Sequence, residues 1–233
     1  MPRPVTINRR CPQALGLIDA WALSKGAARS INLRSPSAAT GPFLEDAVLP
    51  RSGVGLSVRP VAPWTASYLS TPFLPSYSHS GHFTWAAWIR TIAGNTQYPS
   101  PAAWLSDTFK GAGLVWSTAL GGIAGQLGWG TGWVFTPAYP TAGDTDWHHF
   151  AAVYNGTNFA LYVDGKSYGT PTAHTTAPVV HTGDIVFGTH YANHGGGWDF
   201  CGDVADVRYY RYAVPEGIIR QMADLRRAGD LYR

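Results

Sequence analysis

The segment from Thr189 to Phe200 holds the densest group of side chains that could bind a ligand. Its sequence, THYANHGGGWDF, mixes aromatic rings with imidazole, amide and carboxylate groups. A sugar presents apolar ring faces and hydroxyl edges, so an aromatic platform with a few polar groups can contact both. The candidate glycan-binding residues are therefore His190, Tyr191, Asn193, His194, Trp198 and Asp199. The structural alternative is a flexible Gly195-Gly196-Gly197 connection, with Trp198 in the core.

A second aromatic group lies in a stretch rich in glycine and proline, and consists of Trp129, Trp133 and Tyr139. Glycine and proline mark turns and loops, so the sequence predicts these rings in a loop. They are a second candidate for ligand binding, with burial in the core as the alternative.

Catalytic carboxylates are scarce. Hydrolysis of a glycosidic bond needs two carboxyl groups held a few ångströms apart, one of them with a raised pKa. The chain has only two glutamates, Glu45 and Glu216, and Asp203 and Asp206 are predicted on opposite faces of one strand. No serine nucleophile motif and no glycine-rich phosphate loop is evident. The sequence therefore predicts a protein that is not an enzyme, with no catalytic residues.

The eight histidines do not form a metal motif. His148 and His149 are adjacent on a predicted strand, so they point to opposite faces and cannot hold one ion together. At least one of them is expected to be a core histidine whose ring is hydrogen-bonded to the backbone. His190 and His194 share a loop, but tetrahedral zinc would need further convergent ligands. We expect no metal site and no cofactor.

The stretch from Trp147 to Lys166 predicts the hairpin that the other elements must surround. Ala151–Tyr154 and Phe159–Val163 have the small, aromatic and β-branched residues of strands. Asn155–Asn158 forms the first turn and Asp164-Gly165 the second, since Asn, Asp and Gly tolerate positive φ. Residues 159, 161 and 163 share one face at period two, and we expect that face to be buried.

Further strands are predicted on both sides of this hairpin. The predicted segments are Leu15–Leu23, Phe83–Arg90, Trp104-Leu105, Gly113–Ser117, Ile123–Leu127, Asp184–Gly188 and a closing strand over Gly202–Tyr210. Both faces of Phe83–Arg90 are largely apolar, which predicts a central strand. A final helix opens at Pro215, with Ile218, Met222 and Leu225 on one face.

Three of these segments resemble laminin-G-like, concanavalin A-like jelly-roll domains. They are WHHFAAVYNG…LYVDG in the hairpin, FTWAAWIR at 83–90, and GDVADVRYY at 202–210 with the helix that follows. The resemblance extends over about residues 14–225. It implies an all-β, two-sheet antiparallel jelly-roll sandwich with a short C-terminal helix, in which the first and last strands are neighbours. The resemblance specifies the fold more than the function, because this fold hosts many functions.

Structural calcium is common in this family, but the matching positions here have lost their acids. Members often carry F-D-G-x-D-D-Y-V, whereas Val54–Leu69 contains no acidic residue, and Ala205 stands where aspartate is usual. Calcium needs six to eight oxygen ligands, largely carboxylates and carbonyls. The sequence therefore argues against a structural calcium.

Charge is distributed unevenly along the chain. Residues 1–34 hold six basic residues against Asp19 alone, and 208–233 hold six against three acids, while the middle is acidic. Residues 1–13 are basic, flanked by proline and without periodicity, which predicts an extended N-terminal arm followed by one jelly-roll domain over 14–233. If the termini meet, a partner-docking face would include Arg3, Arg9, Arg10, Arg208 and Arg211. Ordinary solvated surface is the alternative.

Several partners and compartments are excluded or favoured by composition. The two cysteines, Cys11 and Cys201, do not form a disulfide framework, and we expect them at opposite ends of the paired first and last strands. No apolar run has the ~20 residues of a membrane span, and no basic motif indicates nucleic acid. No secretory signal follows Met1, which favours synthesis in a bacterial host cytoplasm.

Three classes of function remain. A short laminin-G-like chain with a basic arm resembles single-domain bacteriophage structural proteins, so we expect a virion component, in capsid decoration or in a tail or fibre. Its partners would be other virion proteins and its own subunits in a homo-oligomer. The alternative is a lectin module that binds a host surface glycan. A glycan hydrolase is the third class and lacks a carboxylate pair.

Overall fold

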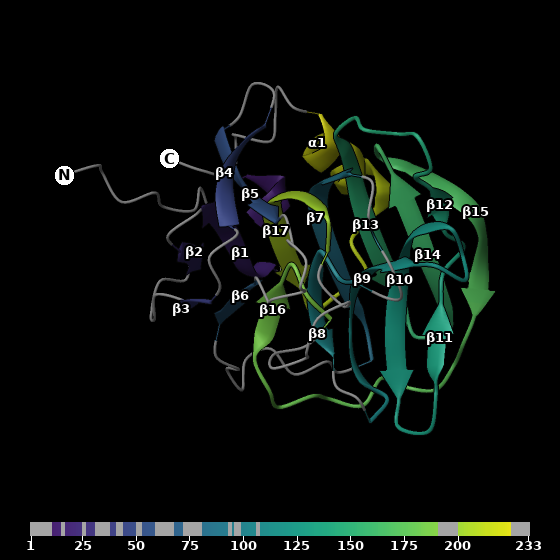
Figure 1. Cartoon of the computed structure of the whole chain (residues 1–233). Helices are drawn as coiled ribbons and strands as arrows, with labels where there is room; N and C mark the ends of the chain where they lie inside the picture. The colour runs from purple at the N-terminus through teal and green to yellow at the C-terminus, as the bar shows by residue number, and fades with distance from the viewer. Residues whose placement is uncertain are drawn as a thin grey trace.

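The computed structural model describes residues 11–14, 17–24, 27–30, 38–40, 44–49, 53–58, 68–71, 81–92, 95, 99–105, 108–190 and 200–224. Within these residues, two antiparallel sheets face each other, and one α-helix packs on the outside of the larger sheet (Figure 1). The predicted all-β jelly-roll sandwich with a short C-terminal helix is confirmed. No helix in this part of the chain is long and apolar enough to cross a membrane.

The larger sheet contains nine strands among the described residues, in the order β15-β14-β13-β7-β17-β1-β2, with β5 paired to β17 and β4 paired to β5. Their bounds are β1 Leu17–Ser24, β2 Ala27–Ser30, β4 Leu44–Leu49, β5 Gly53–Val58, β7 Phe83–Thr91, β13 His148–Tyr154, β14 Asn158–Val163, β15 Lys166–Ala173 and β17 Gly202–Tyr210. The first and last long strands, β1 and β17, pair antiparallel as predicted.

The smaller sheet contains eight strands within the same described ranges, in the order β11-β10-β9-β8-β16-β6-β3, with β12 paired to β10. Their bounds are β3 Ala38–Thr40, β6 Tyr68–Thr71, β8 Ala102–Leu105, β9 Lys110–Ser117, β10 Gly122–Trp129, β11 Trp133–Phe135, β12 Tyr139–Pro140 and β16 Ile185–Phe187. A Cβ on Gly125 of β10 would lie 2.7 Å from the Cβ of Ala152 in β13, so the close approach of the two sheets requires glycine there.

The hairpin predicted from 147–166 is present as β13 and β14, followed by a turn into β15. Phe159 and Leu161 are fully buried and Val163 is 8% exposed, which confirms the predicted inward face. Asp164 (φ 50°) and Gly165 (φ 81°) form the second turn in left-handed backbone conformations, as their residue types predicted.

Strand β7 is central, as predicted. It lies between β13 and β17, and all its residues except Arg90 are buried. Trp85 points into the space between the sheets, where its ring lies 5.9 Å from Trp21 of β1 and 4.9 Å from Tyr209 of β17. Residues 85, 87 and 89 therefore belong to the main core, while 86 and 88 lie on the outer face of the sheet.

Helix α1 (Glu216–Ala223) covers part of that outer face. Its fully buried residues are Ile219 and Met222, and Ile218 is only partly buried. The prediction of Met222 on the buried face is confirmed, but the neighbour at 219, and not Ile218, is the deeply buried isoleucine. The predicted third residue, Leu225, lies outside the described residues.

The stretch 129–139 was wrongly predicted as a loop. Its aromatic residues belong largely to two short strands, β11 and β12, which pair with β10. The glycines mark only the turn from β10 to β11, where Gly130 has φ 98°. The many glycines in this stretch favoured a loop prediction. The short strands β11 and β12 form because they pair with β10, which the local sequence does not indicate.

Candidate functional site

The described residues form a groove on the outer face of the larger sheet, near the end of β7. Its volume is about 660 Å³, and we call it the outer groove. Alternation along β7 places Trp88 and Arg90 there, because residues two apart on a strand share a face. The groove is lined by Trp88, Arg90, Thr145, Asp146, Trp147, His148, Asp164, Ala223 and Asp224. It therefore lies between β7, the segment entering β13, the β14–β15 turn and the end of α1.

Arg90 is held on two sides. Its guanidinium forms an ion pair with the buried carboxylate of Asp203, the neighbouring residue in β17. The same group lies 5.4 Å from the centre of the Trp147 ring, within the range of a cation–π contact. An arginine fixed in this way loses little conformational entropy when its remaining N–H groups bind a ligand.

The two indoles that line the groove have unused donors. The Nε1 atoms of Trp88 and Trp147 are buried and have no hydrogen-bond acceptor within the described part of the chain. Below them His149 packs edge-to-face on Trp88, with ring centroids 5.5 Å apart, and its Nδ1 is likewise buried without a partner in the same set of residues. Unsatisfied buried donors are costly, and the Nε1 atom of Trp85 in the main core is in the same state within the described residues, so these donors alone do not mark a site.

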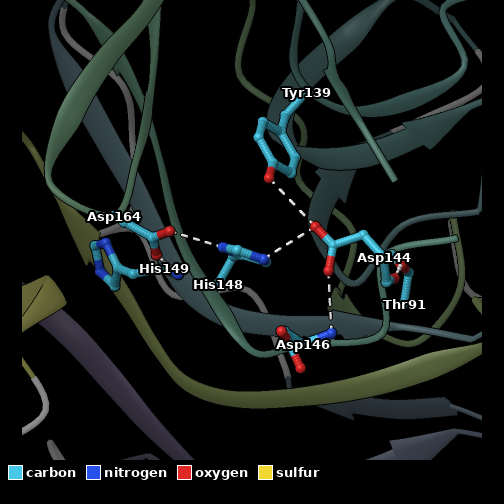
Figure 2. A network of polar contacts seen from close by, with 7 residues as sticks. All are labelled: Thr91, Tyr139, Asp144, Asp146, His148, His149 and Asp164. Carbon is cyan, nitrogen blue, oxygen red and sulfur yellow. Dashed lines mark hydrogen bonds and ion pairs between the residues drawn. The ribbon is translucent and has the colours of Figure 1, made fainter. Parts of the chain in front are cut away.

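A network of polar side chains lies beside the groove and reaches its lining through His148 and Asp164; Figure 2 shows the contacts of this network. The imidazole of His148 lies between two carboxylates, with Nδ1 2.7 Å from Asp164 and Nε2 3.0 Å from Asp144. Tyr139 donates its hydroxyl to Asp144 at 3.2 Å, and the backbone N–H of Asp146 donates to the same carboxylate at 3.1 Å. Because both ring nitrogens of His148 face carboxylate oxygens, the imidazolium is the form that can donate to both.

The network fixes two turns to one strand. Asp164 also accepts the backbone N–H of His149 at 2.9 Å, so the β14–β15 turn is tied to the start of β13. Thr91, at the end of β7, donates its hydroxyl to the carbonyl of Asp144 at 3.0 Å, which holds the segment before β13. The wall of the groove is therefore positioned before any ligand arrives.

The environment raises the pKa of His148 and lowers the pKa values of Asp144 and His149. Burial alone would lower the pKa of His148, but the hydrogen bonds and charges of Asp164 and Asp144 outweigh it and raise that pKa. Burial would raise the pKa of Asp144, but the N–H of Asp146 and the contact with His148 lower it. Burial, followed by the charge of Arg208, lowers the pKa of His149 to about 4. At neutral pH His149 is therefore an uncharged core side chain, as predicted for at least one of the pair. The predicted backbone hydrogen bond is absent at its Nδ1, which has no partner among the described residues.

These features do not supply the groups needed for hydrolysis. A glycosidase needs one carboxyl group with a raised pKa, whereas the pKa of Asp144 is lowered and both acids of the network are engaged by His148. In the described ranges, no three His, Cys, Asp or Glu side chains converge to hold a metal ion. The two carboxylates are thus arranged to hold His148 rather than presented as a separate acid and base at the groove.

Most of the glycan-binding residues predicted from the sequence lie outside the described residues. Tyr191, Asn193, His194, Trp198 and Asp199 lie outside the described residues. His190 is described and is 5% exposed, with its Nδ1 3.1 Å from the hydroxyl of Ser100 and its ring near Trp133. His190 thus packs against the smaller sheet, and the structure gives it no part in the outer groove.

The second aromatic group is partly buried. Trp129 and Tyr139 pack against the main core, and Trp133 packs against a smaller cluster beside it. These rings therefore pack largely in the core, which was the alternative interpretation of this group. The hydroxyl of Tyr139 nevertheless reaches Asp144 in the polar network beside the groove.

Arg208 does not lie on a docking face. It is 1% exposed, and its guanidinium binds Asp206 and the side chain of Gln13. Arg211 is exposed and stays a candidate, while Arg3, Arg9 and Arg10 lie outside the described residues. A register irregularity in β17, with Asp206 at φ 48°, brings Asp206 and Arg208 together, and a regular strand would not have predicted it.

The last residues of the predicted arm pack on the sandwich. Gln13 is 1% exposed, and Cys11 is buried as a free thiol, as is Cys201. Pro12–Ala14 form a 3₁₀ turn, and the carbonyl of Gln13 accepts the hydroxyl of Tyr210 at 2.9 Å. The division of the chain into an arm and a single domain stays a prediction.

The outer groove itself was missed in the sequence. Two signals could have indicated it. Trp88 and Arg90 share the outer face of a central strand, and the acids at 144 and 146 precede Trp147 in a turn. The link between these segments is the pairing of β7 with β13, which joins residues about sixty positions apart and is not visible locally.

Taken together, the two facing sheets define a concanavalin A-like β-sandwich, with a groove on the outer face of its larger sheet. A family model described as the concanavalin A-like lectin/glucanases superfamily matches residues 64–220. The chain belongs to this superfamily. A search of curated proteins finds none that matches the sequence.

Several solved structures are similar to this chain. Domain 4 of AbnA, an extracellular GH43 arabinanase from Geobacillus stearothermophilus, in complex with arabinotriose, has a TM-score of 0.70 and 14% identity, over 89% of this chain and 98% of that one. The binding domain of Paraclostridial mosquitocidal protein 1 has a TM-score of 0.68 and 12% identity, over 91% and 52%. A Trypanosoma rangeli sialidase structure has a TM-score of 0.60 and 14% identity, over 90% and 32%. The chain thus spans about half of the mosquitocidal protein structure and about a third of the sialidase structure. At these identities the similarity shows the fold.

Proposed function

We propose that the protein is a non-enzymatic carbohydrate-binding module whose glycan lies in the outer groove. The observation that carries the proposal is the lining of that groove, where the partly exposed ring of Trp147 lies with Arg90, Asp146 and Asp164, and packs against Trp88, which is 4% exposed. Aromatic rings can cover the apolar face of a sugar, and charged or amide groups at the edges can bind its hydroxyls. The volume of about 660 Å³ is within the usual range of ligand pockets.

The comparisons support the class of ligand but not its identity. Domain 4 of AbnA was solved with arabinotriose, and a similar structure of botulinum neurotoxin type C concerns interaction with two ganglioside molecules. These ligands belong to those proteins. For this chain they favour glycan binding over hydrolysis, in agreement with the lowered pKa of Asp144.

A glycan array followed by calorimetry tests the proposal. The purified protein should bind at least one oligosaccharide, and Trp147→Ala should weaken that binding about tenfold or more, as truncation of a central aromatic residue commonly does. Phe109→Ala is the matched control, because Phe109 is an exposed aromatic residue (38%) in the turn before β9 and outside the groove. Both variants should keep the thermal melting temperature of the unchanged protein within a few degrees.

The proposal fails if the protein binds no glycan on the array. It also fails if Trp147→Ala binds as tightly as the unchanged protein, since the glycan site must then be elsewhere.

We further propose, as a second role, that the module is a component of a bacteriophage virion, in capsid decoration or in a tail or fibre. The observation that favours it is the anchoring of residues 11–14, where Gln13 is bonded to Arg208 of β17 and to the carbonyl of Gln221 in α1. A basic segment 1–10 would then extend from a fixed point, which suits docking to an acidic partner or a sister subunit. Co-purification with intact particles tests this role, and absence from particles contradicts it. Glycan binding at a host surface is compatible with it.

A further inference from the structure

A second hollow lies at the end of the sandwich, next to the outer groove. We call it the rim pocket. Its volume is about 310 Å³, and it lies between the ends of β7 and β9 and the segment that links β12 to β13. Its lining includes Thr91, Asn95, Trp116, Thr141, Ala142 and Thr145.

The two hollows share a wall. Thr145 lines both of them, while Asp144 lines the rim pocket and Asp146 lines the outer groove. This three-residue partition is held from both sides, by Thr91 at the carbonyl of Asp144 and by His148 and Tyr139 at its carboxylate. A ligand that passes over Thr145 would therefore enter both hollows without moving the backbone.

The rim pocket is organised in advance of any ligand. Trp116 donates its indole N–H to the hydroxyl of Thr141 at 2.9 Å, which fixes the orientation of the ring. Asn95 accepts the backbone N–H of Cys201 at 2.7 Å and donates to the carbonyl of the same residue at 2.9 Å. Side chains that are already ordered lose little entropy on binding, which favours affinity.

Size and charge limit what the rim pocket can take. A volume of about 310 Å³ is at the low end for ligand pockets, which suits one sugar unit better than a chain. Asp144 lines the rim pocket, and the adjoining groove carries the exposed acids Asp146 and Asp164 together with two cations, Arg90 and His148. Arg90 is already paired with Asp203, and His148 is shared between Asp144 and Asp164, so the acidic groups outnumber these cations. An anionic sugar would meet like charges at this partition, so the geometry favours a neutral one.

We propose that the rim pocket and the outer groove form one track for a neutral oligosaccharide. Its terminal sugar occupies the rim pocket beside Trp116, and the next units cross Thr145 into the outer groove. This proposal rests on the proposed glycan-binding function and adds to it the end of the glycan that is recognised and its charge.

Filling the rim pocket tests the track. Ala142 is exposed and lines the pocket, so Ala142→Trp should block it without disturbing the core. The matched control is Ala177→Trp, which places the same side chain on an exposed alanine outside both hollows. The probes are the oligosaccharide with the strongest array signal and the same glycan lacking its terminal sugar.

The expected result is a difference between the two probes. Ala142→Trp should weaken binding of the full oligosaccharide about tenfold, to the affinity of the shortened one, and should leave binding of the shortened one unchanged. Ala177→Trp should change neither, and Trp147→Ala should weaken both. In an NMR spectrum of the unchanged protein, the signal of the Trp116 indole N–H should shift when the full glycan is added and should not shift when the shortened one is added.

Each contrary result has a separate meaning. If Ala142→Trp binds the full oligosaccharide normally and the Trp116 signal does not shift, the rim pocket is no subsite, although the outer groove stays the glycan site. If a sialylated or uronic-acid glycan binds more tightly than its neutral counterpart, the inference about charge is overturned. If no glycan binds, the proposed function fails first and the track with it.

Discussion

His148 and His149 are consecutive residues of β13, yet their imidazoles occupy opposite electrostatic environments. His148 lies between the carboxylates of Asp144 and Asp164 at the groove wall. His149 is buried against Trp88, 2% exposed, and near the charge of Arg208. The alternation of a strand separates the two rings, and their pKa values move in opposite directions, so each makes stability depend on pH in its own range.

His149 should make the protein less stable in acid. Its pKa is lowered to about 4 in the folded state, against about 6.5 when unfolded. Between these values the unfolded chain binds the proton and the folded chain does not. The contribution is therefore complete above pH 6.5 and lost as the pH falls toward 4, by on the order of 3 kcal/mol. Urea unfolding from pH 7 to 4.5 should show this slope, and His149→Phe should flatten it. The exposed His82→Gln is the control and should leave the slope unchanged.

His148 should act in the opposite range. Its raised pKa means that the folded state binds the proton more tightly than the unfolded state does. The stabilisation is present below the unfolded pKa, about 6.5, and is lost as the pH rises through the raised value. We expect the melting temperature to fall as the pH rises from about 6.5 through the raised pKa of His148, and His148→Gln to remove the fall. An unchanged fall in the variant would show that another group is responsible.

The inward face of the central hairpin should dominate the stability of the core. Leu161 is fully buried between the sheets, so Leu161→Ala should lower the free energy of unfolding by about 2–5 kcal/mol through lost burial and a cavity. Ser167→Ala, at an exposed position of the edge strand β15, is the control and should change it by less than about 0.5 kcal/mol. Equal effects of the two substitutions would contradict the register of β14.

The hairpin and the central strand could be predicted because their signals are local. Residues 159, 161 and 163 are large apolar residues on one face at period two, and Asp164-Gly165 is a strong turn signal in any fold. The outer groove could not be predicted in the same way, since it depends on β7 and β13 lying side by side. The interior position of Arg208 depends on an irregularity in β17 that residue types do not reveal. Pairing between distant segments thus decided which polar residues became part of a site.

Chelation should leave folding unchanged. The stretch Val54–Leu69 contains no acidic residue that could bind calcium. Asp203 is already paired with Arg90, which argues that it is not a calcium ligand either. Treatment with EDTA should therefore not shift the melting temperature by more than a degree. A drop of several degrees that calcium restores would show that the protein holds a structural ion.

Two truncations of the N-terminus should separate its structural part from its docking part. Removal of residues 1–10 leaves Gln13 in place, so the melting temperature should not change. Removal of residues 1–14 also takes away the side chain that accepts a hydrogen bond from the buried Arg208 and the carbonyl that accepts from Tyr210. Loss of these partners should lower the free energy of unfolding by about 1–3 kcal/mol each, because buried donors are left without them.

The same pair of truncations tests the virion role. If residues 1–10 dock the module, the shorter truncation should fold normally, bind glycan normally and fail to enter particles. Its glycan binding is the internal control, since the outer groove lies at β7 and β13 and not at the 3₁₀ turn Pro12–Ala14. Normal incorporation of this truncated protein would show that segment 1–10 is dispensable, and Arg211 would then be the first exposed residue to test, by Arg211→Glu.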